Sequence, residues 1–423
     1  MKALPVRRGT ALAAAALVTL GALSACSADS DSEGDATTPE TTGASATTEP
    51  AESDSAGGAG QVAVTMVSGS DGDECQLDTD TVAAGPITFN VVNESAAAIS
   101  EFELLSGAKI VGEKENLAPG LPEVSLTLTL GGGDYTVYCP GAVTEQIPFT
   151  VTGEASAAPT GTAAELLQQG ATDYASYVTT QVDAMVTAVQ RLQEAVDSGD
   201  LATAQQAYAE SRPFYEKIES DVDGFVLDGF DPTDNHGNLD YLIDMRASNI
   251  DPAVGWSGFH AVERDLFKKQ KITAKTKKYA ADLLTNVQQL ATVAGTLEFK
   301  PEDLANGAAG LLEEVQANKV TGEEEAFSHI DLVDFAGNVE GAQQAFEALK
   351  PGLTEIDADL TQTITDRFAD VRALLETYKD PSALGGYKLY TAEVKKTDGQ
   401  KLADSVQALQ DSLSRLAEKV ATA

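Results

Sequence analysis

The hydrophobic pattern of this chain changes its period near residue 160, and this change limits the possible folds more than any other sequence feature. Before it, short apolar runs such as Val62–Val67, Ile87–Val92 and Val124–Leu130 are separated by turn formers, as in the strands of a β-sandwich. After it, apolar residues recur in steps of four and three, at Val178, Val182, Met185, Val189, Leu192 and Val196. This spacing places them on one helix face. The sequence therefore predicts an all-β domain followed by an all-α domain.

Changes in composition predict the domain boundaries. We expect the β-sandwich over residues 61–152 and the helical bundle, or two fused bundles, over 162–423, joined by an Ala/Pro/Thr-rich linker at 153–161. Residues 27–60 carry acidic and small side chains but no aromatic or large aliphatic one. Such a composition buries too little apolar surface to fold, so a flexible tether is expected over residues 26–60.

The N-terminal residues indicate export from the cytoplasm. Thr10–Leu23 is apolar, follows three basic residues, and is shorter than the ~20 residues of a membrane span. The small residues before Cys26 resemble a bacterial lipobox, in which residues 1–25 are removed and Cys26 is lipidated. An ordinary signal peptide cut nearby is the alternative. We expect an extracytoplasmic protein anchored to the cell membrane by lipid.

The net charge excludes one class of partner. The chain has 28 basic and 66 acidic residues, a formal net charge of −38. A chain this acidic repels the phosphate backbone, so a nucleic-acid partner is excluded.

The cysteines of the predicted sandwich allow two interpretations. All three histidines, His236, His260 and His329, lie in the helical domain, so the sandwich cannot build a blue-copper centre, which needs two histidines and a cysteine. Outside the cytoplasm, Cys75 and Cys139 could form a disulfide. Alternatively, they could form a metal site with two further side chains, Glu101 and Glu103.

The helical domain contains the pattern expected of a metal site. His260 and Glu263 are three residues apart, on one helix face. A hydrogen-bonded histidine beside a solvated glutamate is the structural alternative for these two residues. Glu216 and Glu219 repeat the spacing. Further acids occur in two other stretches, at Asp244 and at Glu323 and Glu324. Several carboxylates and one imidazole suit iron or manganese better than the thiolate-rich sites that favour zinc or Cu(I).

The order of these motifs resembles the EfeO-type iron-uptake lipoproteins, in which a cupredoxin-like domain precedes an imelysin-like helical domain. The resemblance rests on Tyr215-Glu216-x-x-Glu219, Leu239-Asp240-x-x-Ile243-Asp244-x-Arg246, Gly258-Phe259-His260-x-x-Glu263, Thr321-Gly322-Glu323-Glu324 and, in the sandwich, Cys75, Glu101-Phe102-Glu103 and Tyr135-x-x-x-Cys139. It covers nearly everything from Val62 onward.

The resemblance implies a cleft in which iron, as Fe2+ or Fe3+, is bound on its way to a membrane iron permease. Its ligands would be His260, Glu263, Glu216, Glu219, Asp244 and one of Glu323 and Glu324. A second site for copper or iron would map to Cys75, Cys139, Glu101 and Glu103. A haem-containing Dyp-type peroxidase is the other partner that the family implies.

Two other functions compete with transport. A zinc-dependent metallopeptidase of imelysin type needs a firmly held metal with an open position for water, but no His-Glu-x-x-His motif occurs in the sequence. A copper redox module that oxidises Fe(II) in the sandwich is the second alternative. We expect a metal-binding transport component rather than an enzyme.

Overall fold

The computed structural model describes residues 58–107, 109–154, 159–222 and 225–423, all within one compact unit, Ser55–Ala423. The predicted signal peptide, Cys26 and all but the last residues of the predicted tether lie outside the described residues. Among the described helices, none combines the length and the apolar character that crossing a membrane requires.

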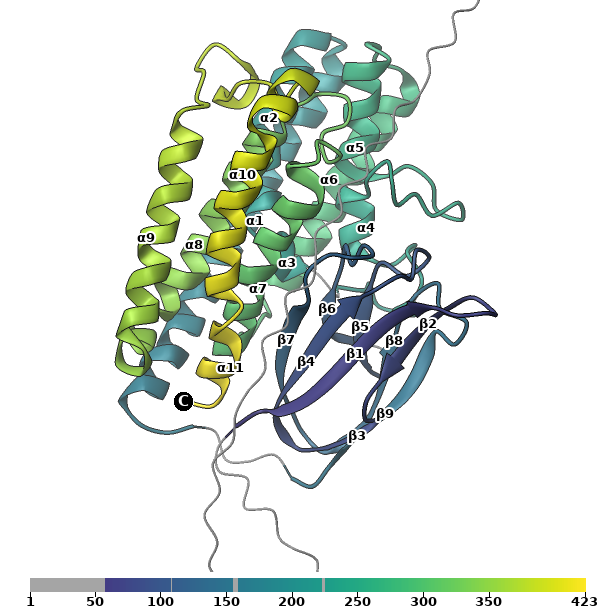
Figure 1. Ribbon diagram of the computed structural model, residues 1–423. Helices are drawn as coiled ribbons and strands as arrows, with labels where there is room; N and C mark the ends of the chain where they lie inside the picture. The colour runs from purple at the N-terminus through teal and green to yellow at the C-terminus, as the bar shows by residue number, and fades with distance from the viewer. Residues whose placement is uncertain (1–57, 108, 155–158, 223–224) are drawn as a thin grey trace, which may run out of the picture. The chain divides into compact units, whose positions relative to one another are not determined.

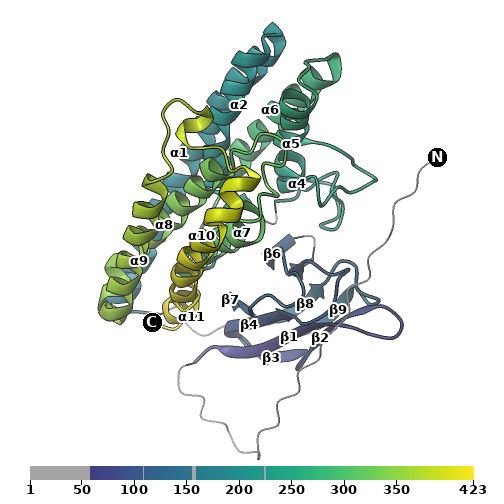
Figure 2. The same cartoon turned by 45° about the horizontal axis from the view of Figure 1, so that its top comes forward.

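The described chain begins with two β-sheets (Figures 1 and 2). One has the strand order β2-β1-β4-β7 and the other the order β3-β9-β8-β5-β6. The strands are β1 Gly60–Ser68, β2 Asp73–Leu77, β3 Thr81–Ala83, β4 Gly85–Asn93, β5 Phe102–Ser106, β6 Lys109–Lys114, β7 Val124–Leu130, β8 Gly133–Tyr138 and β9 Gln146–Thr152. The pairs β1/β4 and β3/β9 are parallel, and the other pairs are antiparallel.

The two sheets share one core, to which their inward-facing side chains contribute. In β1, the buried residues are Val62, Val64 and Met66. The ring of Phe89 in β4 lies 5.4 Å, between centroids, from Phe102 in the other sheet. The predicted sandwich is therefore confirmed.

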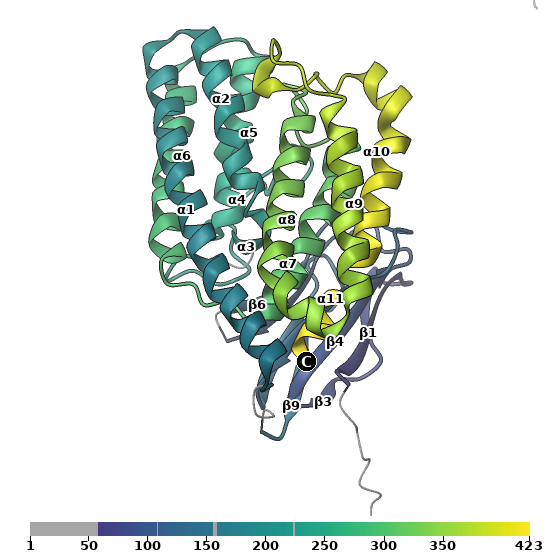
Figure 3. The ribbon, with the colours of Figure 1, turned by 90° about the vertical axis from the view of Figure 1, so that its left-hand side faces the viewer.

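The rest of the described chain is helical (Figure 3). The α-helices are α1 Thr162–Ser198, α2 Leu201–Glu216, α3 Glu219–Val222, α4 Leu239–Asp244, α5 Gly258–Glu263, α6 Ala274–Ala294, α7 Pro301–Glu314, α8 Asp331–Ile356, α9 Ala358–Glu376, α10 Ala392–Leu413 and α11 Leu416–Ala421. Turns of π-helix at Arg264–Lys268 and Val315–Lys319 follow α5 and α7, and Leu384–Gly386 is a short 3-10 turn.

Helix α1 organises the bundle by packing against α2, α6 and α8. The apolar stripe predicted on this helix is buried in full. The helix ends where Gly199 adopts a left-handed conformation (φ 78°), which glycine accepts without a steric penalty. The Asp200 side chain then accepts hydrogen bonds from the N–H groups of Ala202 and Thr203 and caps α2. An all-α domain after the sandwich is thus confirmed.

Polar contacts join the sandwich to helix α7. The Asn306 side chain donates to the carbonyl of Thr127 in β7, 2.6 Å away, and accepts from the same residue's N–H group. Lys114 of β6 forms a 2.8 Å ion pair with Glu313. These contacts bring the end of β6 close to the acidic residues described next.

Candidate metal centre

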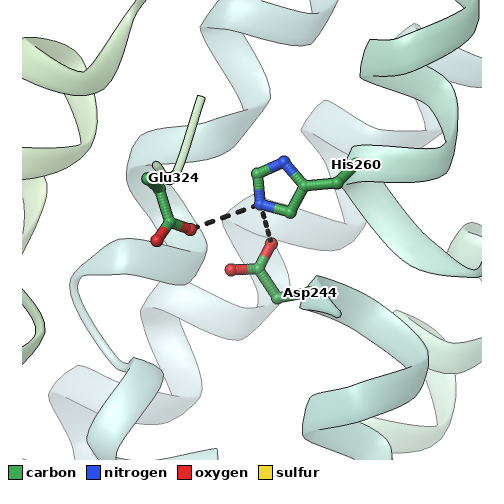
Figure 4. A group of neighbouring side chains, drawn as sticks. All are labelled: Asp244, His260 and Glu324. Atoms are coloured by element: carbon green, nitrogen blue, oxygen red, sulfur yellow. Dashed lines mark hydrogen bonds and ion pairs between the residues drawn. The ribbon is translucent and has the colours of Figure 1, made fainter. Parts of the chain in front are cut away.

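Segments that are far apart in the sequence bring their charged side chains together inside the helical domain. Asp244 ends α4, His260 lies in α5, and Glu324 lies in the loop before α8. Figure 4 shows these three side chains pointing toward one another. The Nε2 atom of His260 lies 3.2 Å from a Glu324 oxygen and 3.5 Å from an Asp244 oxygen. One potential ligand atom from each residue lies within 4.8 Å of the others, and no side chain is more than 4% exposed.

A close approach of α4 and α5 places His260 beside Asp244. Gly258, the first residue of α5, has φ +64°, and a Cβ atom there would lie 2.0 Å from the carbonyl oxygen of Ile243. Only glycine fits this contact. Glu263 lies one helical turn after His260, and its carboxylate is 3.2 Å from the Nδ1 atom of that histidine. That contact orients the ring so that Nε2 faces Asp244 and Glu324.

Glu263 also fixes the loop that carries Glu324. Its second carboxylate oxygen accepts hydrogen bonds from the N–H groups of Phe327 and Ser328, at 2.8 and 2.7 Å. The predicted face formed by His260 and Glu263 is therefore present, but the glutamate contacts the loop as well as the imidazole.

Two acids outside the predicted ligand set complete further groups of side chains that could hold a metal ion. Glu325 joins His260 and Glu263, and Asp334 joins Glu216 and Glu324. The Oδ1 atom of Asp334 is buried, with no hydrogen-bond partner among the described residues. Glu325 directly follows Glu324, and Asp334 lies ten positions after it, so the density of acids around Glu324 was the available signal.

Three buried cations of the described chain, none of them among the predicted site residues, lie among these acids. Arg212 forms ion pairs with carboxylates of Glu216, Asp244, Glu324, Glu325 and Asp334. Arg246 lies 2.7 Å from Glu314 and 3.4 Å from Glu324. Lys319 lies 3.2 Å from both Glu216 and Glu219, 3.3 Å from Glu324 and 3.7 Å from Glu314. Glu219 therefore faces the cluster through Lys319 although a break separates α2 from α3.

Burial and neighbouring charges shift the pKa values of the buried acids and of His260 in opposite directions. Burial raises the pKa of Glu216 to about 8, although Lys319 and Arg212 oppose the shift. For Glu324, burial also favours the neutral acid, but Lys319, Arg246 and His260 outweigh it and hold the pKa well below its usual value. Burial lowers the pKa of His260, yet the Asp244 charge and hydrogen bonds to Glu263 and Glu324 raise it well above its usual value. The neighbouring cations therefore hold Glu324 as an anion.

The remaining sequence candidates lie elsewhere. Glu323 is half-buried, and it is Glu324 that joins the cluster. Cys75 and Cys139 are joined by a disulfide, which is the first of the two interpretations of these cysteines. The pair therefore offers no free thiolate to a metal. Burial, followed by the charge of Glu101, raises the pKa of Glu103 to about 8. Burial also raises the pKa of Glu101, against the charge of Arg246.

Comparison with known proteins adds two findings. Residues 170–416 match the imelysin family (peptidase M75). The chain is 33% identical over 347 residues to the "Iron uptake system component EfeO" of Escherichia coli strain K12 and of Shigella flexneri, over 81% of this chain and 88% of each relative.

Proposed function

Because this chain belongs to the family of EfeO iron uptake system components, with an imelysin domain, we propose that it binds an iron ion in its helical domain and delivers it to a membrane iron permease. Asp244, His260 and Glu324 would be the central ligands. Glu216, Glu219 and Glu263 would supply further oxygen atoms or orient the ligands.

The convergence of Asp244, His260 and Glu324 carries this proposal. Three separate chain segments place one ring nitrogen and two carboxylates at mutual distances that a single ion can bridge. Carboxylate oxygens and one imidazole form a hard donor set that suits Fe2+ and Fe3+. The buried carboxylates around them add negative charge that attracts a cation. Protons held by the acids and by His260 would be released as the ion binds.

Burial of the centre favours a carrier over a peptidase. A zinc peptidase needs an open coordination position that a polypeptide substrate can reach, whereas these three side chains are at most 4% exposed. The disulfide between Cys75 and Cys139 likewise disfavours the copper redox alternative, since a paired cysteine supplies no thiolate ligand. We therefore propose a transport component without catalytic activity, and copper in the sandwich would have to rely on Glu101 and Glu103.

The family also guides the proposal about location and partners. We propose that Cys26 is lipidated and anchors the chain at the outer face of the cell membrane. A membrane permease and a haem-containing Dyp-type peroxidase would be its partners.

Metal titration tests the proposed function. Calorimetry of the purified protein with Fe2+ under anaerobic conditions, and with Fe3+, Cu2+ and Zn2+, should show iron as a tightly bound ion. His260→Gln should weaken iron binding by about tenfold or more, with unchanged helicity by circular dichroism. His329→Gln is the matched control, because His329 is exposed and lies outside the cluster. Equal iron affinity of the two variants would refute the assignment.

A further inference from the structure

An acidic cleft opens beside the candidate centre. It has a volume of about 270 Å3 and lies between β6 on one side and α3 and α7 on the other. Its ionisable lining consists of eight carboxyl groups and one lysine, Lys114. A pocket lined mainly by one sign of charge concentrates ions of the opposite sign, so this cleft suits metal cations.

Two carboxylates of the cleft lining contact Lys319. Glu219 and Glu314 line the cleft, and both contact the ammonium group of Lys319, at 3.2 and 3.7 Å. The other two partners of this ammonium, Glu216 and Glu324, are outside the cleft lining and belong to the candidate centre. Lys319 therefore lies between the cleft and the centre.

A bound metal cation would compete with the ammonium group of Lys319 for the same carboxylates. This buried ammonium is surrounded by four carboxylates at 3.2 to 3.7 Å. At such distances a metal ion that shares Glu324 with this ammonium would be strongly repelled by it. Lysine carries its charge on a flexible stem, and Lys319 ends the π-helical turn Val315–Lys319, just before the loop that holds Glu324. Single π-helical turns often mark functional positions.

We propose that Lys319 is the gate between the cleft and the candidate centre: its ammonium bridges Glu219 of the cleft and Glu324 of the centre, and an incoming metal ion displaces it from both. This inference rests on the proposed function and adds the path and the residue that controls it. The same ammonium competes with the bound ion, which limits affinity and favours release to a partner.

Removal of the charge distinguishes a gate from a counter-ion that only stabilises the acids. Purified wild type, Lys319→Met and Lys319→Gln would be titrated by calorimetry with Mn2+ and, under anaerobic conditions, Fe2+. A gate predicts that both variants bind at least about tenfold more tightly than wild type, because the competing charge is gone. Equal or weaker binding by the two variants would overturn the proposal.

Lys114→Met is the matched control. Lys114 is a buried lysine of the same cleft, 4% exposed, and it pairs with Glu313 at 2.8 Å rather than with the carboxylates around Lys319. The affinity of Lys114→Met for either ion should stay within about threefold of wild type, because Lys114 does not contact the ligands of the centre and Coulomb repulsion falls with distance. An equal gain in Lys114→Met and Lys319→Met would mean that the general field, and not the gate, sets the affinity.

A second measurement uses the wild-type protein and so does not depend on whether the variants fold. Brief acylation with acetic anhydride, followed by mass spectrometry, reports the accessibility of each lysine. Labelling of Lys319 should rise when the protein is saturated with Mn2+, because the displaced ammonium moves into the cleft. Unchanged labelling of Lys319 would overturn the gate. Failure of wild type to bind Mn2+ and Fe2+ would overturn the proposed function as well, whereas binding without any effect of Lys319 refutes the gate only.

Discussion

Replacing Glu263 by alanine tests whether this residue organises the candidate centre. Its carboxylate is fully buried, accepts the N–H groups of Phe327 and Ser328, and contacts His260. In Glu263→Ala those donors lose their acceptor, and the loop that presents Glu324 loses its attachment to α5. We expect a less stable helical domain and weaker iron binding.

The size of the effect follows from these contacts. A hydrogen bond to a charged group contributes about 1.5–3 kcal/mol, so two backbone N–H groups give about 3–6 kcal/mol. Removing one of several neighbouring negative charges offsets part of this loss, since the charge of Glu263 disfavours ionisation of Glu325. We therefore expect the lower end, about 3 kcal/mol, or a fall of about 6 °C in melting temperature for a domain of this size. Glu263→Gln keeps one acceptor oxygen and should lose about half as much.

Thermal unfolding followed by circular dichroism measures this difference. Glu340→Ala serves as the control, because Glu340 is an exposed helical glutamate paired with Lys217, and surface pairs contribute about 0–1 kcal/mol. If Glu263→Ala and Glu340→Ala melted at the same temperature, the carboxylate of Glu263 would not be what holds the loop.

Gly258→Ala should destabilise the protein by about 3 kcal/mol or more in denaturant unfolding and abolish tight iron binding, because its Cβ would overlap the carbonyl oxygen of Ile243. Replacing Cys75 and Cys139 together by alanine should lower stability by about 4 kcal/mol, as expected for a bridge across 64 residues; thiol counting that found both cysteines free in the wild type would contradict it. Burial raises the pKa of Asp303 to about 6, against a hydrogen bond from a backbone N–H, so the folded protein holds an extra proton between about pH 4 and 6. The free energy of unfolding should therefore fall as pH rises through this window, by at most about 1.4 kcal/mol per pH unit. Unfolding curves at several pH values should show that Asp303→Asn lacks this fall between about pH 4 and 6 and follows the pH dependence of wild type outside that range.

The sequence pattern predicted much of the fold because burial of apolar side chains follows the period of each element. The apolar stripe of α1 is an example, because every residue predicted on it is buried. Strands β2, β3 and β6 were not predicted. They are short or only half-buried, so their pairing depends on the neighbouring strands more than on their own residues.

Composition and local spacing suffice for the two fold classes, the acidic character and the set of residue types that can hold iron. Which acids meet depends on how the helices and loops pack. This packing brings Glu324 rather than Glu323 into the centre, adds Asp334 and Glu325, and places Lys319 among the carboxylates. Contacts between residues a hundred positions apart depend on how helices pack, and buried charges are tolerated only where opposite charges meet them. That balance of charge is a property of the folded interior, and no local stretch of sequence displays it.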